Sequence, residues 1–240
     1  HLKKIIIPVL ALICMVALLF NSAQYYLPAD SGAVVQTLPV IMLDAGHGGV
    51  DGGAVADDGT MEKDINLAIT KKMNVFLHFF GYDVLQTRET DISIHDDDSA
   101  TIRQKKVSDI RNRLAMLEET NAQLLISIHQ NKYSESYCKG TQVFYGGNND
   151  GSKLLAQNVQ QKVVSLVQQD NTREIKRSTK DIYLLWNATK PAVMVECGFL
   201  SNGADLEKLK TDAYQCTMAF AIVCGLNQYQ TGGEREVGEE

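Results

Sequence analysis

The sequence lacks an excess of positive charge. Its 23 lysines and arginines are outnumbered by 29 aspartates and glutamates, which gives a formal net charge of −6. A protein that binds DNA or RNA through phosphate contacts needs a basic face, so we expect no nucleic-acid partner. Internal repeats and long low-complexity tracts are also missing. A composition that is 45% hydrophobic and 22% charged is ordinary for one globular domain with appendages.

Cysteine pairs with close spacing are absent as well. The five cysteines match no disulfide framework, and Cys216 and Cys224 stand eight positions apart on an expected helix, too far apart to bridge. We therefore expect free thiols. No Gly-Lys-Ser or Gly-Lys-Thr follows the glycine loop at residues 46–49, so the sequence offers no phosphate loop for a nucleotide.

The first twenty residues carry a hydrophobic run. Lys3 and Lys4 precede an uncharged apolar stretch from Ile5 to Phe20, which is long for a signal-peptide core and short for a transmembrane helix. We favour a signal anchor over residues 1–20, with a cleaved signal peptide as the alternative. Both interpretations place the remaining chain outside the cytoplasm. Residues 21–39 are expected to be a linker, 40–229 the folded domain and 230–240 a disordered acidic tail.

The apolar pattern of residues 40–229 predicts an α/β fold. Helical spacing predicts helices over 62–80, around 107–117, around 154–167 and over 212–229, with Thr60 capping the first. Strand patterns occupy 40–47, 82–88, 124–129, 140–147 and 192–196, and a brief apolar element lies at 181–186. This alternation predicts a single three-layer domain with a mostly parallel or mixed central sheet flanked by helices.

Three of these buried-strand patterns end in a potential metal ligand or base. The first ends at His47, the second at His129 and the third at Glu196. The carboxyl ends of parallel strands meet at one edge of a sheet, and a further acid, Glu62, opens the helix after the glycine loop. Two histidines and two carboxylates there would form a His₂Glu zinc site with one free carboxylate. The pattern indicates metal-assisted hydrolysis but does not assign the two acids.

Four segments carry a family resemblance. They are LDAGHGGVDGGA at 43–54, MEKDIN at 61–66, LISIHQN at 125–131 and PAVMVECGFLSN at 191–202. In order and spacing they resemble the zinc-dependent N-acetylmuramoyl-L-alanine amidases of the Amidase-3 family, over most of residues 40–229. The resemblance implies one Zn²⁺ bound by His47, Glu62 and His129, with Glu196 as the catalytic carboxylate. It also matches Arg88 and Arg113, which we interpret as structural or cleft-edge residues.

The resemblance also implies a substrate and a reaction. The family hydrolyses the amide bond between the lactyl group of N-acetylmuramic acid and L-alanine in peptidoglycan. Zinc held by three protein ligands activates water for such a reaction. Glu196 is then expected to accept the proton of that water and pass it to the leaving amine. Two alternatives remain, a zinc peptidase acting on peptide bonds and a non-catalytic wall-binding module.

The arrangement of the chain resembles one subgroup in particular. A catalytic domain behind an apolar segment, without cell-wall-binding repeats, is similar to spore-former amidases that act on cortex peptidoglycan, help make muramic lactam and permit germination. This implies an extracytoplasmic protein, membrane-anchored or secreted, with the forespore intermembrane space as one location. Because several members of the family are switched by partners, an accessory activating protein is also expected. Gly52, Gln130 and Trp186 depart from the family pattern, and we expect none of them to touch the zinc set.

Overall fold

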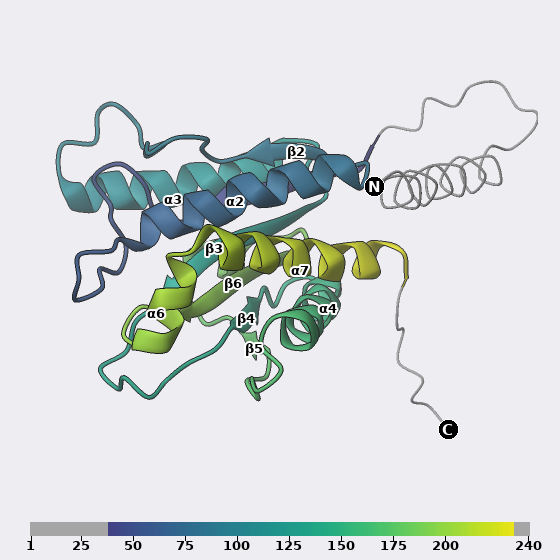
Figure 1. Ribbon diagram of the computed structural model, residues 1–240. Helices are drawn as coiled ribbons and strands as arrows, with labels where there is room; N and C mark the ends of the chain where they lie inside the picture. The colour runs from purple at the N-terminus through teal and green to yellow at the C-terminus, as the bar shows by residue number, and fades with distance from the viewer. Residues whose placement is uncertain (1–37, 233–240) are drawn as a thin grey trace, which may run out of the picture. The chain divides into compact units, whose positions relative to one another are not determined.

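The computed structural model describes residues 38–232, in which six strands form one sheet (Figure 1). Their order across the sheet is β2-β1-β3-β6-β4-β5. The strands are β1 (Val40–Ala45), β2 (Asp83–Gln86), β3 (Leu124–Asn131), β4 (Gln142–Tyr145), β5 (Lys176–Arg177) and β6 (Ala192–Phe199). Neighbouring strands are parallel except that β4 runs antiparallel to β6. The carboxyl ends of β1, β3 and β6 therefore lie at the same end of the sheet as the amino end of β4. We call this end of the sheet the catalytic edge.

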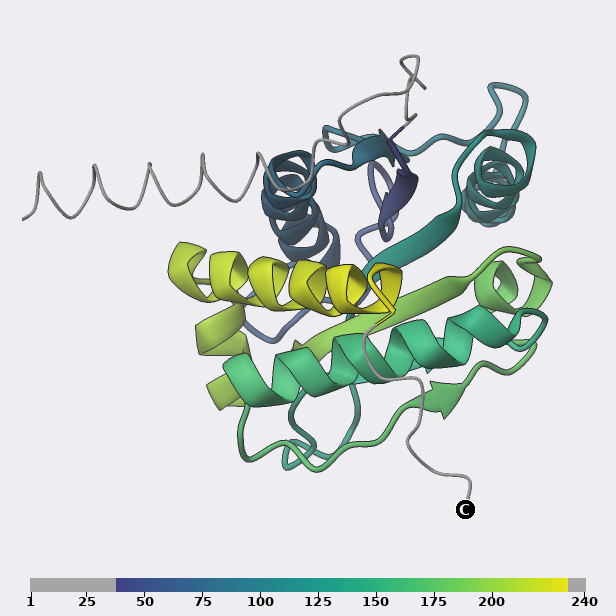
Figure 2. The ribbon, with the colours of Figure 1, turned by 90° about the vertical axis from the view of Figure 1, so that its right-hand side faces the viewer.

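Helices cover both faces of this sheet. The helices are α2 (Glu62–Phe79), α3 (Ile102–Glu119), α4 (Asp150–Leu166), α5 (Tyr183–Asn187), α6 (Gly203–Leu209) and α7 (Asp212–Gln230). Figure 2 shows α2, α4 and α7 packed together along the sheet. The helix α3 packs with α5 against the other face. Side chains alternate between two apolar clusters along each central strand, since Ile41 and Leu43 face the first group of helices while Met42 faces the second.

The expected fold class is confirmed, with several local corrections. The strands β3 and β6 do not end at His129 and Glu196 but continue to Asn131 and Phe199, because β6 keeps pairing with β3 beyond these residues. Thr60 does not cap α2, whose N-cap is Met61 without a side-chain hydrogen bond. The element at 181–186 is the short helix α5. The strand β5 and the helix α6 were not predicted.

Some expectations fall outside the described residues. The apolar run Ile5–Phe20, the linker up to residue 37 and the acidic tail from residue 233 belong to this group. Between residues 38 and 232, no helix combines the length and hydropathy needed to cross a bilayer. The four cysteines in that range, Cys138, Cys197, Cys216 and Cys224, are free thiols as expected.

Candidate metal centre

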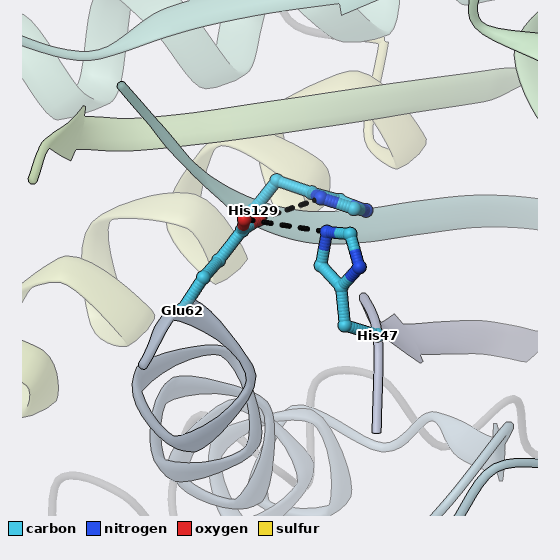
Figure 3. Close-up of side chains that lie close together, drawn as sticks. All are labelled: His47, Glu62 and His129. Carbon is cyan, nitrogen blue, oxygen red and sulfur yellow. Dashed lines mark hydrogen bonds and ion pairs between the residues drawn. The ribbon is translucent and has the colours of Figure 1, made fainter. Parts of the chain in front are cut away.

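Three of the predicted site residues converge at the catalytic edge. His47 follows β1, His129 lies near the end of β3, and Glu62 is the first residue of α2 (Figure 3). One potential ligand atom from each lies within 4.8 Å of the others. Glu62 Oε1 is 2.9 Å from His129 Nδ1, and Glu62 Oε2 is 3.3 Å from His47 Nε2. The chain thus places two imidazoles on either side of one carboxylate.

The loop that carries His47 has an unusual backbone. His47 has φ of 62°, the left-handed region that side chains other than glycine rarely adopt, and glycines surround it in the sequence. Hydrogen bonds join Gly48 and Asp51 in both directions, which closes the loop tightly. A strained conformation persists only where its surroundings enforce it, so the contacts of this loop determine where the imidazole points.

Two buried arginines hold the loop through its carbonyl groups. Arg113 of α3 donates Nη1 to the Ala45 carbonyl at 2.9 Å and Nη2 to the His47 carbonyl at 2.8 Å. Arg88 donates Nε to the same Ala45 carbonyl at 2.9 Å and Nη2 to the Gly46 carbonyl at 3.1 Å. Three successive carbonyls thus receive guanidinium hydrogen bonds. Both arginines act on the backbone, which favours the structural over the cleft-edge interpretation of these two residues.

Asp44 neutralises the charge that Arg113 brings into the interior. Its carboxylate is 1% exposed, pairs with Arg113, and accepts hydrogen bonds from Thr87 Oγ1 at 2.9 Å and Ser127 Oγ at 2.5 Å. Burial alone would raise the pKa of Asp44, but the charges of Arg113 and His129 and the hydrogen bonds from Ser127 and Arg113 together outweigh burial and lower the pKa to about 2. The pair therefore stays ionised beneath the His47 loop across the physiological pH range.

A second acid orients the His47 ring. Asp51 Oδ2 lies 2.8 Å from His47 Nδ1, so this nitrogen donates its proton to the carboxylate while Nε2 faces Glu62. Lys106 holds the other oxygen of Asp51 at 2.7 Å. Burial acts to lower the pKa of His47, but the hydrogen bonds and charges of Asp51 and Glu62 raise it to about 9. Without a metal, His47 is therefore an imidazolium at neutral pH.

Backbone amides fix Glu62 in place. Its carboxylate is 4% exposed and accepts hydrogen bonds from Ala54 N at 2.8 Å and Gln130 N at 3.0 Å. Asn66 Nδ2 adds a third at 3.3 Å. Burial would raise the pKa of Glu62, yet the hydrogen bonds and charges of His129 and His47 hold it well below its usual range. Gln130 reaches Glu62 through its backbone amide, which any residue at this position offers, whereas its side chain donates to Asn66 Oδ1 at 3.2 Å.

Two glycines let these side chains approach. A β-carbon at Gly46 would lie 2.2 Å from His129 Nε2. One at Gly53, whose φ is 68°, would lie 2.6 Å from both Glu62 Oε2 and a ring carbon of His47. Neither position has room for a larger residue. The glycine-rich composition of this loop therefore serves the packing of the three converging side chains.

Glu196 lies beside this cluster in a contrasting environment. In the parallel pairing of β3 and β6 it is the direct partner of His129. Its Oε2 is fully enclosed and accepts no hydrogen bond from residues 38–232. Burial raises the pKa of Glu196 to about 7, and the charge of Glu62 adds to this while His129 and His47 oppose it. A carboxyl group of this kind can gain and lose a proton near neutral pH.

The converging donor set fits a divalent metal ion. Two imidazole nitrogens and one carboxylate are the His₂Glu set found in catalytic zinc sites, which leave one position for water or substrate. Asp51 behind His47 is the outer carboxylate that orients a ligating imidazole in such sites. Sequence analysis assigned no role in the site to Asp44 or Asp51. The four-residue spacing of His47 and Asp51 within a tight turn was the signal for this contact.

Comparison with known proteins identifies the family. The model of the N-acetylmuramoyl-L-alanine amidase family Amidase_3 matches residues 41–228. The chain is 34% identical over 192 residues to the germination-specific N-acetylmuramoyl-L-alanine amidase of Bacillus subtilis, covering 80% of each protein. It is 29% identical over 191 residues to the amidase LytC of the same organism, of which it covers 35%. The chain therefore belongs to the N-acetylmuramoyl-L-alanine amidase family.

Solved structures agree with this assignment. The CwlD amidase from Clostridioides difficile, in a complex with the GerS lipoprotein, superposes with a TM-score of 0.78 at 40% identity. That match covers 81% of this chain and 99% of CwlD. The amidase AmiC2 of Nostoc punctiforme superposes with a TM-score of 0.69 at 27% identity, covering 80% of this chain and 97% of AmiC2.

Proposed function

We propose that this protein is a zinc-dependent N-acetylmuramoyl-L-alanine amidase. It hydrolyses the amide bond between the lactyl group of N-acetylmuramic acid and L-alanine in peptidoglycan. The observation that carries the proposal is the convergence of His47, Glu62 and His129 beside Glu196, in a chain of this amidase family. The three converging residues hold one zinc ion, and Glu196 is the catalytic carboxylate.

Each residue then has a defined task. Zinc, when bound, supplies Lewis-acid catalysis by polarising the scissile carbonyl and making water more acidic. Glu196 accepts a proton from the attacking water and delivers it to the amine of L-alanine as that amine leaves. A pKa of about 7 suits both halves of this transfer, because the carboxylate form and the acid form are both accessible at neutral pH. Glu62 keeps its charge and remains a ligand.

Mass spectrometry of digested peptidoglycan tests the proposal. Purified peptidoglycan is incubated with the zinc-loaded protein, and the products are sequenced. We expect intact stem peptides with new L-alanine N-termini and muramic acid with free lactyl carboxyls. New N-termini at internal peptide positions would favour the alternative, a zinc peptidase. Absence of any cleavage by protein shown to contain zinc would favour a non-catalytic wall-binding module.

We further propose a role in the spore cortex. The similarity to a germination-specific amidase over most of both chains supports this role. We infer that the protein works outside the cytoplasm, held at a membrane through Ile5–Phe20, with the forespore intermembrane space as one location. The complex of CwlD with a lipoprotein supports an accessory partner for this chain as well. Recovery of the full-length chain in the soluble fraction of producing cells would contradict membrane attachment.

A further inference from the structure

Three side chains form a row across the sheet at the catalytic edge. In register, His129 of β3 is paired with Glu196 of β6, and Glu196 is paired with Gln142 of β4. Directly paired residues project from the same face of a sheet, and neighbouring strands lie about 4.8 Å apart. The row thus runs from a proposed metal ligand to the proposed proton carrier and then to an amide.

Arg173 extends this row by one group. Its Nη1 donates to Gln142 Oε1 at 3.2 Å, and its Nε donates to the Lys139 carbonyl at 2.8 Å. The guanidinium carbon lies 4.5 Å from the centre of the Phe199 ring, so the group is stacked on a buried aromatic side chain. Nη2 donates no hydrogen bond to any residue between 38 and 232. The Arg173 guanidinium is therefore held in position beside the row, and its Nη2 group is available to donate to a ligand.

The neighbouring acids do not neutralise this cation. Asp170 forms an ion pair with Lys139 at 2.6 Å. Asp205 is buried, and its Oδ2 accepts backbone hydrogen bonds from Gly140 at 2.8 Å and Phe199 at 3.0 Å. Arg173, Asp170 and Asp205 all line a hollow of about 290 Å³, and none of the three residues of the row lines it. Arg173 therefore borders open space that a ligand can enter.

We propose that the stem peptide runs from Glu196 over β4, and that Arg173 binds a carboxylate on the residue that follows L-alanine. This inference rests on the proposed function, since the direction comes from the proton transfer. The leaving amine must lie against Glu196, and His129 occupies the opposite side of that residue in the row. The peptide that carries the amine therefore extends toward Gln142 and Arg173, and the sugar lies on the other side.

The distances fit a substrate of this class. From the nitrogen of L-alanine, an extended chain reaches a main-chain carboxylate of the next residue after about 6 Å, given standard bond lengths. One strand spacing of about 5 Å separates Glu196 from Gln142, and Arg173 is 3.2 Å beyond the amide oxygen of Gln142. A guanidinium presents parallel donors that match a carboxylate, so Arg173 is a specificity residue for acidic stem peptides.

Two matched substrates test this assignment. They are muramoyl peptides that differ only at the residue after L-alanine, which carries either a free carboxylate or the corresponding carboxamide. We expect the wild-type zinc-loaded protein to cleave the acid with a kcat/KM about tenfold above that of the amide, mainly through KM, because hydrogen bonds between charged groups are the strong ones. Arg173→Gln should remove this preference, and Arg173→Lys should keep part of it.

The control is Arg177→Gln, which changes the exposed arginine of β5 at the far end of β4. It should leave the preference for the acid unchanged. Zinc content and thermal unfolding of each variant separate binding effects from misfolding, and calorimetric titration of the released acidic peptide measures its affinity without turnover. An equal loss on both substrates in Arg173→Gln, or equal cleavage of both by the wild type, would overturn the assignment. Failure of the wild type to cleave either substrate would instead refute the proposed function.

Discussion

The two sides of the candidate site differ in how many hydrogen-bond and ion-pair partners they give to their charged groups. On the ligand side, formed by β1, β3 and α2, every charged group has partners: Glu62 accepts two backbone hydrogen bonds, and Asp44 pairs with Arg113. On the base side, formed by β6 and β4, Glu196 has an enclosed oxygen without any partner among residues 38–232. The first side holds the pKa values of its acids low, whereas the second raises that of Glu196.

This difference follows from what each side must do. A ligand or an anchor has to keep one charge state, and hydrogen bonds to the charged form secure it. A proton carrier has to exchange its charge during each turnover, and partners that fix one state would slow it. The surroundings of the two glutamates thus shift their pKa values in opposite directions, down for Glu62 and up for Glu196. Four predictions test this division.

The largest effect is expected from exchanging the two glutamates for glutamine separately. Glu196→Gln should retain zinc and lose about 10²–10⁴-fold in the rate of amide hydrolysis, because only the proton transfer is removed. Glu62→Gln should lose zinc, because the two histidines that remain as ligands do not hold the ion tightly. Metal analysis and hydrolysis rates are measured side by side, with the exposed Glu174→Gln as control. If the Glu196→Gln protein contains no zinc, or if it keeps the hydrolysis rate of the wild type, the roles are assigned wrongly.

Removal of Arg113 tests the anchor beneath the His47 loop. Arg113→Leu should destabilise the protein by about 3–5 kcal/mol in denaturant unfolding, because Asp44 is left buried without its counter-charge. Arg111→Leu, on the exposed face of the same helix, is the control and should change little. Adding Asp44→Asn to Arg113→Leu should restore part of the loss. Independent, additive effects of the two changes would mean that they are not coupled.

Loss of the Asp51 carboxylate should have a smaller effect. Asp51→Asn is expected to weaken zinc binding by about 10–100-fold, because Asp51 orients the His47 ring. The measurement is competition with a chelator above pH 9, where less than half of His47 is protonated and its protonation competes only weakly with the metal. Asp57→Asn, which changes a fully exposed acid, serves as control. An unchanged affinity in Asp51→Asn would remove Asp51 from the site.

The last prediction concerns the pH dependence of zinc binding, which needs no substitution. Because His47 has a pKa of about 9 without metal, zinc binding must release its proton below that pH. Affinity should therefore rise about tenfold per pH unit from pH 7 and level off near 9. The charged His47 also stabilises the zinc-free protein, fully below its ordinary pKa of 6.5, and this stabilisation is lost as the pH rises through about 9. Calorimetry in buffers of different ionisation enthalpy measures the number of protons released when zinc binds. A value of zero at every pH would contradict the prediction.

The sequence predicted the central strands and the convergence better than the contacts behind them. The mostly apolar run at 124–128 predicted a buried strand, which placed His129 at the catalytic edge although β3 continues to Asn131. Glu62 needed the family resemblance, because an acid in the first turn of a helix is common on its own. The bond between Asp44 and Arg113 joins residues 69 positions apart, and no local pattern encodes it. The elements α6 and β5 are too short to show a period.

The reversed direction of β4 has an evolutionary consequence. In a sheet of parallel strands, each connection must return from one edge to the other, so a change in its length disturbs the packing of a whole layer. Since β3 ends and β4 begins at the catalytic edge, the connection over residues 132–141 stays there throughout. It can lengthen or shorten while strand register, metal ligands and base stay in place. Relatives with this sheet are thus free to vary this connection beside the candidate site without moving its ligands.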